Sequence, residues 1–89
     1  MEQTNEIYSD STSGDQVIRR FSETTGPIEL KWHRDAEDRL IVSTEVTDWK
    51  LQTEDCLPIG LNSEVYIPSG VWHRLIKGTG DLTLKIVKK

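Results

Sequence analysis

The chain has few of the residues that mark several common classes of protein. A single cysteine, Cys56, stands among its 89 residues, so an intrachain disulfide and every zinc site with several thiolates are excluded. No apolar stretch approaches the roughly 20 residues of a membrane-spanning helix. The first residues lack the basic start and apolar run of a signal peptide. These absences predict a cytoplasmic protein with no membrane partner.

Acidic residues outnumber basic ones, 15 to 11. The formal net charge is -4, and the basic residues are scattered except for Lys85, Lys88 and Lys89 near the end of the sequence. Proteins that bind nucleic acids draw much of their affinity from clustered lysine and arginine. The composition therefore predicts no nucleic-acid partner, and the lysines near the end are typical of a protected edge strand.

The length of 89 residues leaves room for one domain. Residues 1–15 are almost entirely polar, with Ile7 and Tyr8 as the only sizeable apolar groups. Because such a segment buries little surface, we expect residues 1–15 to form a flexible polar tail and residues 16–89 to form a single domain.

From Gln16 onward, short runs of β-branched and aromatic residues alternate with residues that favour turns, and no helical periodicity is present. This pattern predicts about eight strands, at Val17–Ser22, Pro27–Trp32, Leu40–Thr47, Trp49–Thr53, Leu57–Leu61, Val65–Ile67, Val71–Lys77 and Leu82–Val87. Many short antiparallel strands must close or stack to hide their edges, which leaves a sandwich, a barrel or a jelly roll. The predicted fold class is all-β.

Alternation within two of these segments predicts which side chains are buried. Leu82, Leu84 and Ile86 fall on one face of the last strand. In Pro27–Trp32 the apolar face holds Ile28, Leu30 and Trp32, so that His33 falls on the opposite, polar face. Because the apolar and polar residues of this segment do not both fit one small interior, we expect one face to meet a second subunit in a homodimer.

The stretch from Asn62 to Lys77 resembles the second sequence motif of the cupins, G-x5-P-x-G-x2-H-x3-N. Pro68, Gly70 and His73 have the spacing of this motif, whereas Asn62 and Lys77 replace its first glycine and its final asparagine. The resemblance implies a small antiparallel β-barrel of the cupin type, also described as a jelly roll.

Residues 32–42 resemble the first cupin motif, whose core is H-x-H-x3-E followed by a hydrophobic strand. His33 matches the first histidine, Asp35 stands at the second, and Arg39 occupies the position of the glutamate. In cupins the two motifs bring three histidines and a glutamate together around a divalent ion. The resemblance therefore implies a metal site made of His33, Asp35 and His73, a set that suits one ion of iron, manganese, nickel or zinc.

Arg39 supports a second interpretation, in which no metal is bound. A guanidinium about 5 Å from a divalent cation costs about 6 kcal/mol at an effective dielectric constant of about 20. An inward-facing Arg39 would instead pair with nearby carboxylates, and His33, Asp35, Arg39 and His73 would form a polar cluster that binds a small polar or anionic ligand. The residues leave both interpretations open.

The sequence is also similar to short cupin-like proteins of tailed phages, through strings such as His33-Arg-Asp and Leu57-Pro58. That group carries no activity to transfer. Three functions follow as hypotheses: a binding module for a small molecule, a metal-dependent enzyme of the dioxygenase or isomerase type, and a non-catalytic accessory protein encoded by a phage.

Overall fold

The computed structural model describes residues 8–25 and 30–89, and every regular element within these two ranges is a strand. Neighbouring strands are antiparallel throughout. None of the described residues forms a helix that is long and apolar enough to cross a membrane. The strands are β1 (Tyr8–Ser13), β2 (Gln16–Phe21), β3 (Arg39–Ser43), β4 (Lys50–Thr53), β5 (Ile59–Gly60), β6 (Val65–Ile67), β7 (His73–Ile76) and β8 (Leu82–Lys88).

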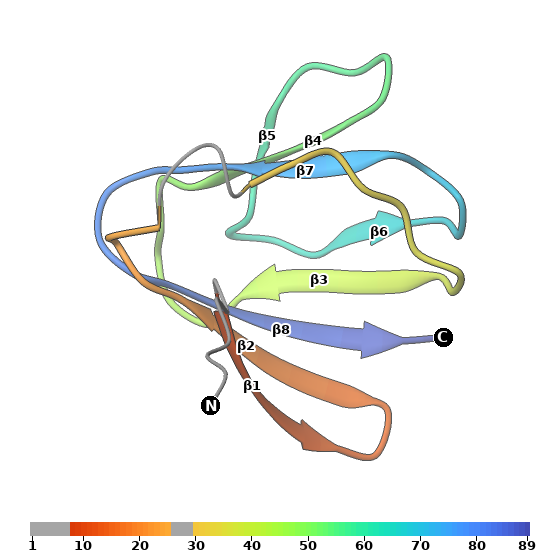
Figure 1. Cartoon of the computed structure of the whole chain (residues 1–89), viewed down its shortest axis with the longest axis horizontal. Coiled ribbons are helices and arrows are strands. Elements are labelled where there is room, and N and C mark those ends of the chain that lie inside the picture. The colour runs from red at the N-terminus through yellow and green to blue at the C-terminus, as the bar shows by residue number, and fades with distance from the viewer. Residues whose placement is uncertain (1–7, 26–29) are drawn as a thin grey trace, which may run out of the picture.

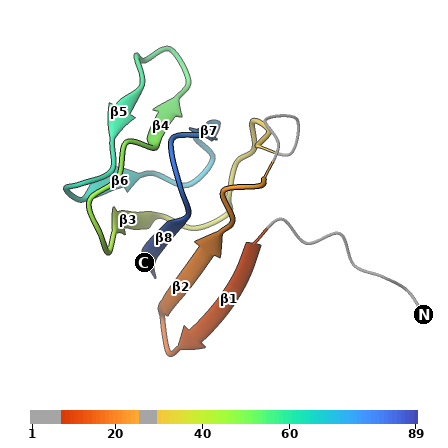
Figure 2. The ribbon, with the colours of Figure 1, turned by 90° about the vertical axis from the view of Figure 1, so that its left-hand side faces the viewer.

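The strands form two sheets. The larger sheet has the order β1-β2-β8-β3-β6, and the smaller sheet has the order β5-β4-β7 (Figure 1). When the molecule is turned by 90°, β4 and β5 lie at the end opposite the hairpin of β1 and β2 (Figure 2). The all-β fold predicted from the sequence, a small antiparallel β-barrel, is confirmed.

Apolar side chains from both sheets fill the space between them. Leu82, Leu84 and Ile86 are all buried, as the alternation in the last strand predicts. Trp49 is fully buried, and its indole Nε1 donates a hydrogen bond to the carbonyl oxygen of Gly80 at 3.0 Å. A buried tryptophan keeps its N–H satisfied in this way. The other core residues are Val17, Phe21, Leu30, Ile41, Leu51, Leu61 and Ile67.

The predicted strand Pro27–Trp32 is wrong in its described part. Residues 27–29 lie outside the described residues, residues 30–32 have no strand structure, and pairing begins only at His33. Leu30 is buried but Trp32 is 41% exposed, so these two residues do not share one buried face. A strand needs a partner along its length, and among the described residues 30–33 a single bridge at His33 is the only pairing. The homodimer inferred from this segment stays a prediction.

The hairpin of β1 and β2 corrects the predicted tail. Residues 8–13 pair with β2 from Tyr8 opposite Phe21 to Ser13 opposite Gln16, although all six are exposed. Backbone pairing, which leaves no trace in the hydrophobic pattern, holds this strand in place. The prediction of a tail over residues 1–15 is therefore wrong for residues 8–13, whereas residues 1–7 lie outside the described residues.

A close approach of two loops fixes the connection from β7 to β8. A Cβ atom added to Gly78 would lie 2.6 Å from the backbone nitrogen of Trp49, so only glycine fits. Beside it, the backbone N–H and the hydroxyl of Thr79 donate hydrogen bonds to the Asp48 carboxylate at 2.7 and 2.9 Å. The carboxylate thus ties the two loops together.

Candidate functional site

A single β-bridge brings two distant histidines together. The backbone N–H of His33 donates to the carbonyl oxygen of His73 at 2.9 Å, and the N–H of His73 donates back at 2.8 Å. The centroids of the two imidazole rings lie 4.2 Å apart. The His73 side chain is buried, whereas that of His33 is 51% exposed. The exposed histidine and the buried histidine therefore meet at the edge of the barrel interior.

The turn of the second motif holds the loop that carries Asp35. The backbone N–H of Gly70 donates to the carbonyl oxygen of Asp35 at 2.8 Å, and the N–H of Ser69 donates to a carboxylate oxygen of Asp38 at 2.7 Å. Gly70 has a φ of 80°, a left-handed conformation that favours glycine. The Pro68-Ser-Gly turn thereby fixes the backbone at Asp35.

Each histidine is oriented through its Nδ1 atom. In His73 this atom lies 2.8 Å from the carbonyl oxygen of Val71, and in His33 it lies 3.2 Å from that of Lys31. A carbonyl oxygen only accepts hydrogen bonds, so Nδ1 carries the proton in both rings. In the neutral form of each ring, Nε2 is then a lone-pair donor, an arrangement typical of histidines that bind a metal.

The Asp35 carboxylate faces both Nε2 atoms. Its Oδ2 atom lies 3.2 Å from Nε2 of His73 and 4.0 Å from Nε2 of His33. This oxygen is buried and makes no hydrogen bond within the described part of the chain. One ligand atom from each of the three residues lies within 4.8 Å of the other two. The structure thus brings together the three residues that the resemblance to cupins implies as metal ligands.

Arg39 faces inward beside this cluster. Its side chain is 12% exposed, and its Nη1 atom lies 3.3 Å from Oδ2 of Asp35. Its Nη2 atom donates to the Glu37 carboxylate at 3.0 Å, which lowers the pKa of Glu37. Alternation places Arg39 on the same face of β3 as the buried Ile41. The guanidinium is therefore neutralised by two carboxylates, as the metal-free interpretation expects.

The environment of the buried His73 favours its neutral form. Burial lowers the pKa of His73 below its ordinary value, and the nearby His33 and Arg39 act in the same direction. The contact with the Val71 carbonyl and the charge of Asp35 oppose this shift but do not reverse it. A neutral imidazole is the form that binds a metal ion.

A cavity of about 320 Å³ opens beside the cluster. His33, Asp35 and Arg39 lie in its wall, together with an arginine that the sequence reasoning missed, Arg19 on β2. The signal was present in the alternation of β2, because Arg19 falls on the same face as the buried Val17 and Phe21. The rest of the wall consists of Tyr8, Phe21, Leu30, Lys31 and Leu75.

No protein-family model matches the sequence. No curated protein matches it either.

Several solved structures share this architecture. A cupin-2 domain protein from Shewanella frigidimarina has a TM-score of 0.64 and 19% identity, over 97% of this chain and 85% of that protein. A hydroxypropylphosphonic acid epoxidase from S. wedmorenis, in complex with fosfomycin, has a TM-score of 0.66 and 14% identity over 92% of this chain. An Fe(II) HppE structure matches equally well over the same share. The chain spans about half the length of the last two, 50% and 48%.

Proposed function

We propose that this chain, whose fold is that of the cupins, binds one divalent metal ion through His33, Asp35 and His73. The observation that carries the proposal is the contact between Nε2 of His73 and Oδ2 of Asp35 at 3.2 Å. With the proton of His73 on Nδ1, both of these atoms are hydrogen-bond acceptors. Two acceptors at this distance repel one another unless a proton or a cation lies between them. The Arg39 guanidinium, 3.3 Å from Oδ2, offsets the charge of Asp35, whereas a metal ion would satisfy both acceptors.

The charges around the cluster support a cation. Asp35, Glu37 and Arg39 together carry one net negative charge, so the guanidinium does not leave the site positive. Two imidazoles and one carboxylate suit Fe(II), Mn(II), Ni(II) or Zn(II). Such an ion would act as a Lewis acid at the edge of the cavity, which suits the metal-dependent dioxygenase and isomerase classes. The structural match to Fe(II) HppE is consistent with this choice.

A second candidate function is a metal-free site for a small anionic ligand. The 3.3 Å contact between Nη1 of Arg39 and Oδ2 of Asp35 favours it, because this guanidinium occupies the carboxylate oxygen that a metal ion would use. A proton shared between Asp35 and His73 would then take the place of the ion. In this form Arg39 would serve as the charge anchor for the ligand.

Metal analysis separates the two candidates. Protein purified without chelators is analysed by mass spectrometry of its elements, alongside Asp35→Asn, His73→Ala and the control Asp38→Asn. The control alters a carboxylate of the same loop, and its amide oxygen still accepts the hydrogen bond from Ser69. We expect near-equimolar metal in the wild type and in the control, and none in the other two. Protein that is metal-free and takes up none of the four ions on titration contradicts the metal site.

A further inference from the structure

Three basic side chains, Arg19, Lys31 and Arg39, line the cavity beside the cluster together with the Asp35 carboxylate. Arg19 and Arg39 are also paired with carboxylates outside the wall, those of Asp10 and Glu37. We propose that Arg19 anchors the carboxylate of a small organic acid with a short apolar body. This inference rests on the proposed function in one respect, that a ligand binds in the cavity. It adds the chemical class of that ligand.

The position of Arg19 is fixed by the strand that carries it. Arg19 lies on the same face of β2 as the buried Val17 and Phe21, which is the face toward the barrel interior. Its side chain is only 17% exposed. Arg20, the next residue, faces the opposite way and is exposed. An arginine on an inward face is unusual because its charge must be satisfied there. The Asp10 carboxylate meets part of this requirement, and a ligand group in the cavity would pair with the remaining N–H groups of the guanidinium.

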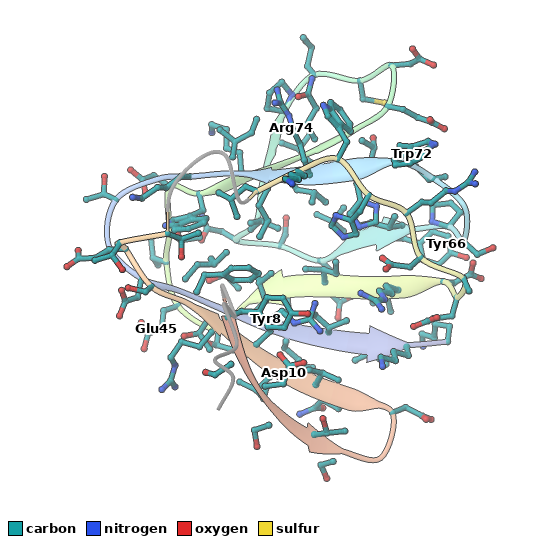
Figure 3. All side chains as sticks on the ribbon, viewed as in Figure 1. Tyr8, Asp10, Glu45, Tyr66, Trp72 and Arg74 are labelled. Carbon is teal, nitrogen blue, oxygen red and sulfur yellow. The ribbon has the colours of Figure 1, made fainter. Side chains whose placement is uncertain are left out.

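Two residues of β1 hold the guanidinium rigidly. Nε and Nη2 of Arg19 donate to the two carboxylate oxygens of Asp10 at 2.8 and 2.9 Å. The guanidinium carbon also lies 4.0 Å from the centre of the Tyr8 ring. Figure 3 labels Tyr8 and Asp10 along β1. Within the described residues Arg19 uses only these two nitrogens, so its Nη1 atom keeps its N–H groups for a ligand.

The remaining wall defines the body of the ligand. Phe21, Leu30 and Leu75 supply apolar surface, and the Tyr8 ring adds an aromatic face. A volume of about 320 Å³ lies near the lower end of the range for sites that bind small molecules. A planar guanidinium matches the geometry of a carboxylate better than that of a spherical anion. The wall therefore fits a compact molecule with one carboxylate and a short hydrocarbon or aromatic part.

Calorimetric titration with phenylacetate and its neutral isostere phenylacetamide tests this inference. We expect the wild type to prefer phenylacetate, and Arg19→Gln to bind it at least tenfold more weakly with little change for phenylacetamide. Arg20→Gln is the matched control, because it removes the same charge from the outer face and should bind both compounds as the wild type does. Equal binding of both compounds by the wild type, or binding of neither, overturns the proposal.

Asp10→Asn shows whether a loss of phenylacetate binding comes from the missing guanidinium or from damage to the hairpin of β1 and β2. It breaks the same ion pair but keeps the guanidinium, so we expect it to bind phenylacetate at least as tightly as the wild type. An equal loss in Asp10→Asn and Arg19→Gln overturns the proposal, because the ion pair alone would then explain both.

The outcome for the metal site does not depend on the outcome for the anion site. An Arg19-dependent preference that persists in His73→Ala supports the anion site without the metal. Normal metal content in an Arg19→Gln protein that binds phenylacetate like the wild type supports the metal site alone and overturns the anion site.

Discussion

His73 and Asp35 lie with two buried lone-pair atoms, Nε2 and Oδ2, only 3.2 Å apart. The proton that would normally join such atoms is held on the far side of the imidazole by the Val71 carbonyl. The hydrogen bond that orients the imidazole therefore leaves no proton between Nε2 of His73 and Oδ2 of Asp35. This arrangement is unfavourable in isolation and becomes favourable when a cation lies between the two atoms.

Asp35→Asn should uncouple metal binding from stability. The amide group of asparagine donates a hydrogen bond to Nε2 of His73, so the two facing atoms are no longer both hydrogen-bond acceptors and no longer repel one another. We expect metal affinity to fall by about 100-fold or more, while the free energy of unfolding of the metal-free protein stays within about 1 kcal/mol of the wild type. Metal titration and urea unfolding in the presence of a chelator measure the two effects. Unchanged metal affinity would exclude Asp35 as a ligand.

Arg39→Gln should move the same two quantities in opposite directions. The metal-free protein loses the cation that balances Asp35, so its unfolding midpoint in urea should fall. Loss of the nearby positive charge should raise the affinity for a divalent ion by at least about tenfold, since like charges no longer repel. Competition with a chromogenic chelator gives the affinity. A parallel loss of stability and of metal binding would instead show that Arg39 only supports the fold.

The ion pair of Asp10 and Arg19 predicts a pH-dependent contribution to stability. The hydrogen bonds from Arg19 lower the pKa of Asp10 below its ordinary value of 3.8. Because the folded pKa is depressed, the stabilisation is fully present above a pH of about 5 and is lost as the pH falls through 3.8 toward the lower pKa. Asp10→Asn should cost about 0.5–1 kcal/mol at neutral pH, a range typical of partly exposed pairs. Urea unfolding of both proteins should give converging stabilities in acid and a smaller difference at high salt.

Gly78→Ala tests the packing of the two loops. The added methyl group would collide with the backbone of Trp49, which is part of the chain and yields less easily than a side chain. We expect a loss of about 1–3 kcal/mol in the free energy of unfolding. Gly60→Ala is the control, because nothing lies within 4 Å of an added Cβ there, and it should change stability by no more than about 0.5 kcal/mol. Equal effects of the two substitutions would refute the proposed close approach.

Much of the barrel could be read from the sequence because its strands bury one face. The alternation that ends in Ile86 and the short segment Val65–Ile67 predicted real strands, the second with the bounds that the structure shows. Turn residues also located the Pro68-Ser-Gly turn, and the resemblance to the second cupin motif singled out His73. Each of these features leaves a local pattern of residue types, which is all that a single sequence can display.

The parts that were missed depend on contacts between distant segments. β1 contains no buried residue, so only its register with β2 reveals it as a strand. The resemblance to cupins named His33, but the predicted strand before it is absent from the described residues 30–32, and one bridge to His73, forty positions away, positions this residue. Arg19 showed the right alternation, but its importance depends on a cavity formed partly by β1 and by the loop that carries Asp35.

The edge position of β1 has a consequence for access to the cavity. Among the described strands, β1 pairs only with β2, and it adds no side chain to the hydrophobic core, yet it carries Tyr8, which lies in the cavity wall. Fraying of β1 would break one ladder of hydrogen bonds and leave the rest of the barrel assembled. Amide protons of β1 should therefore exchange with solvent faster than those of β8, and a bound ligand should slow the exchange selectively in the outer hairpin.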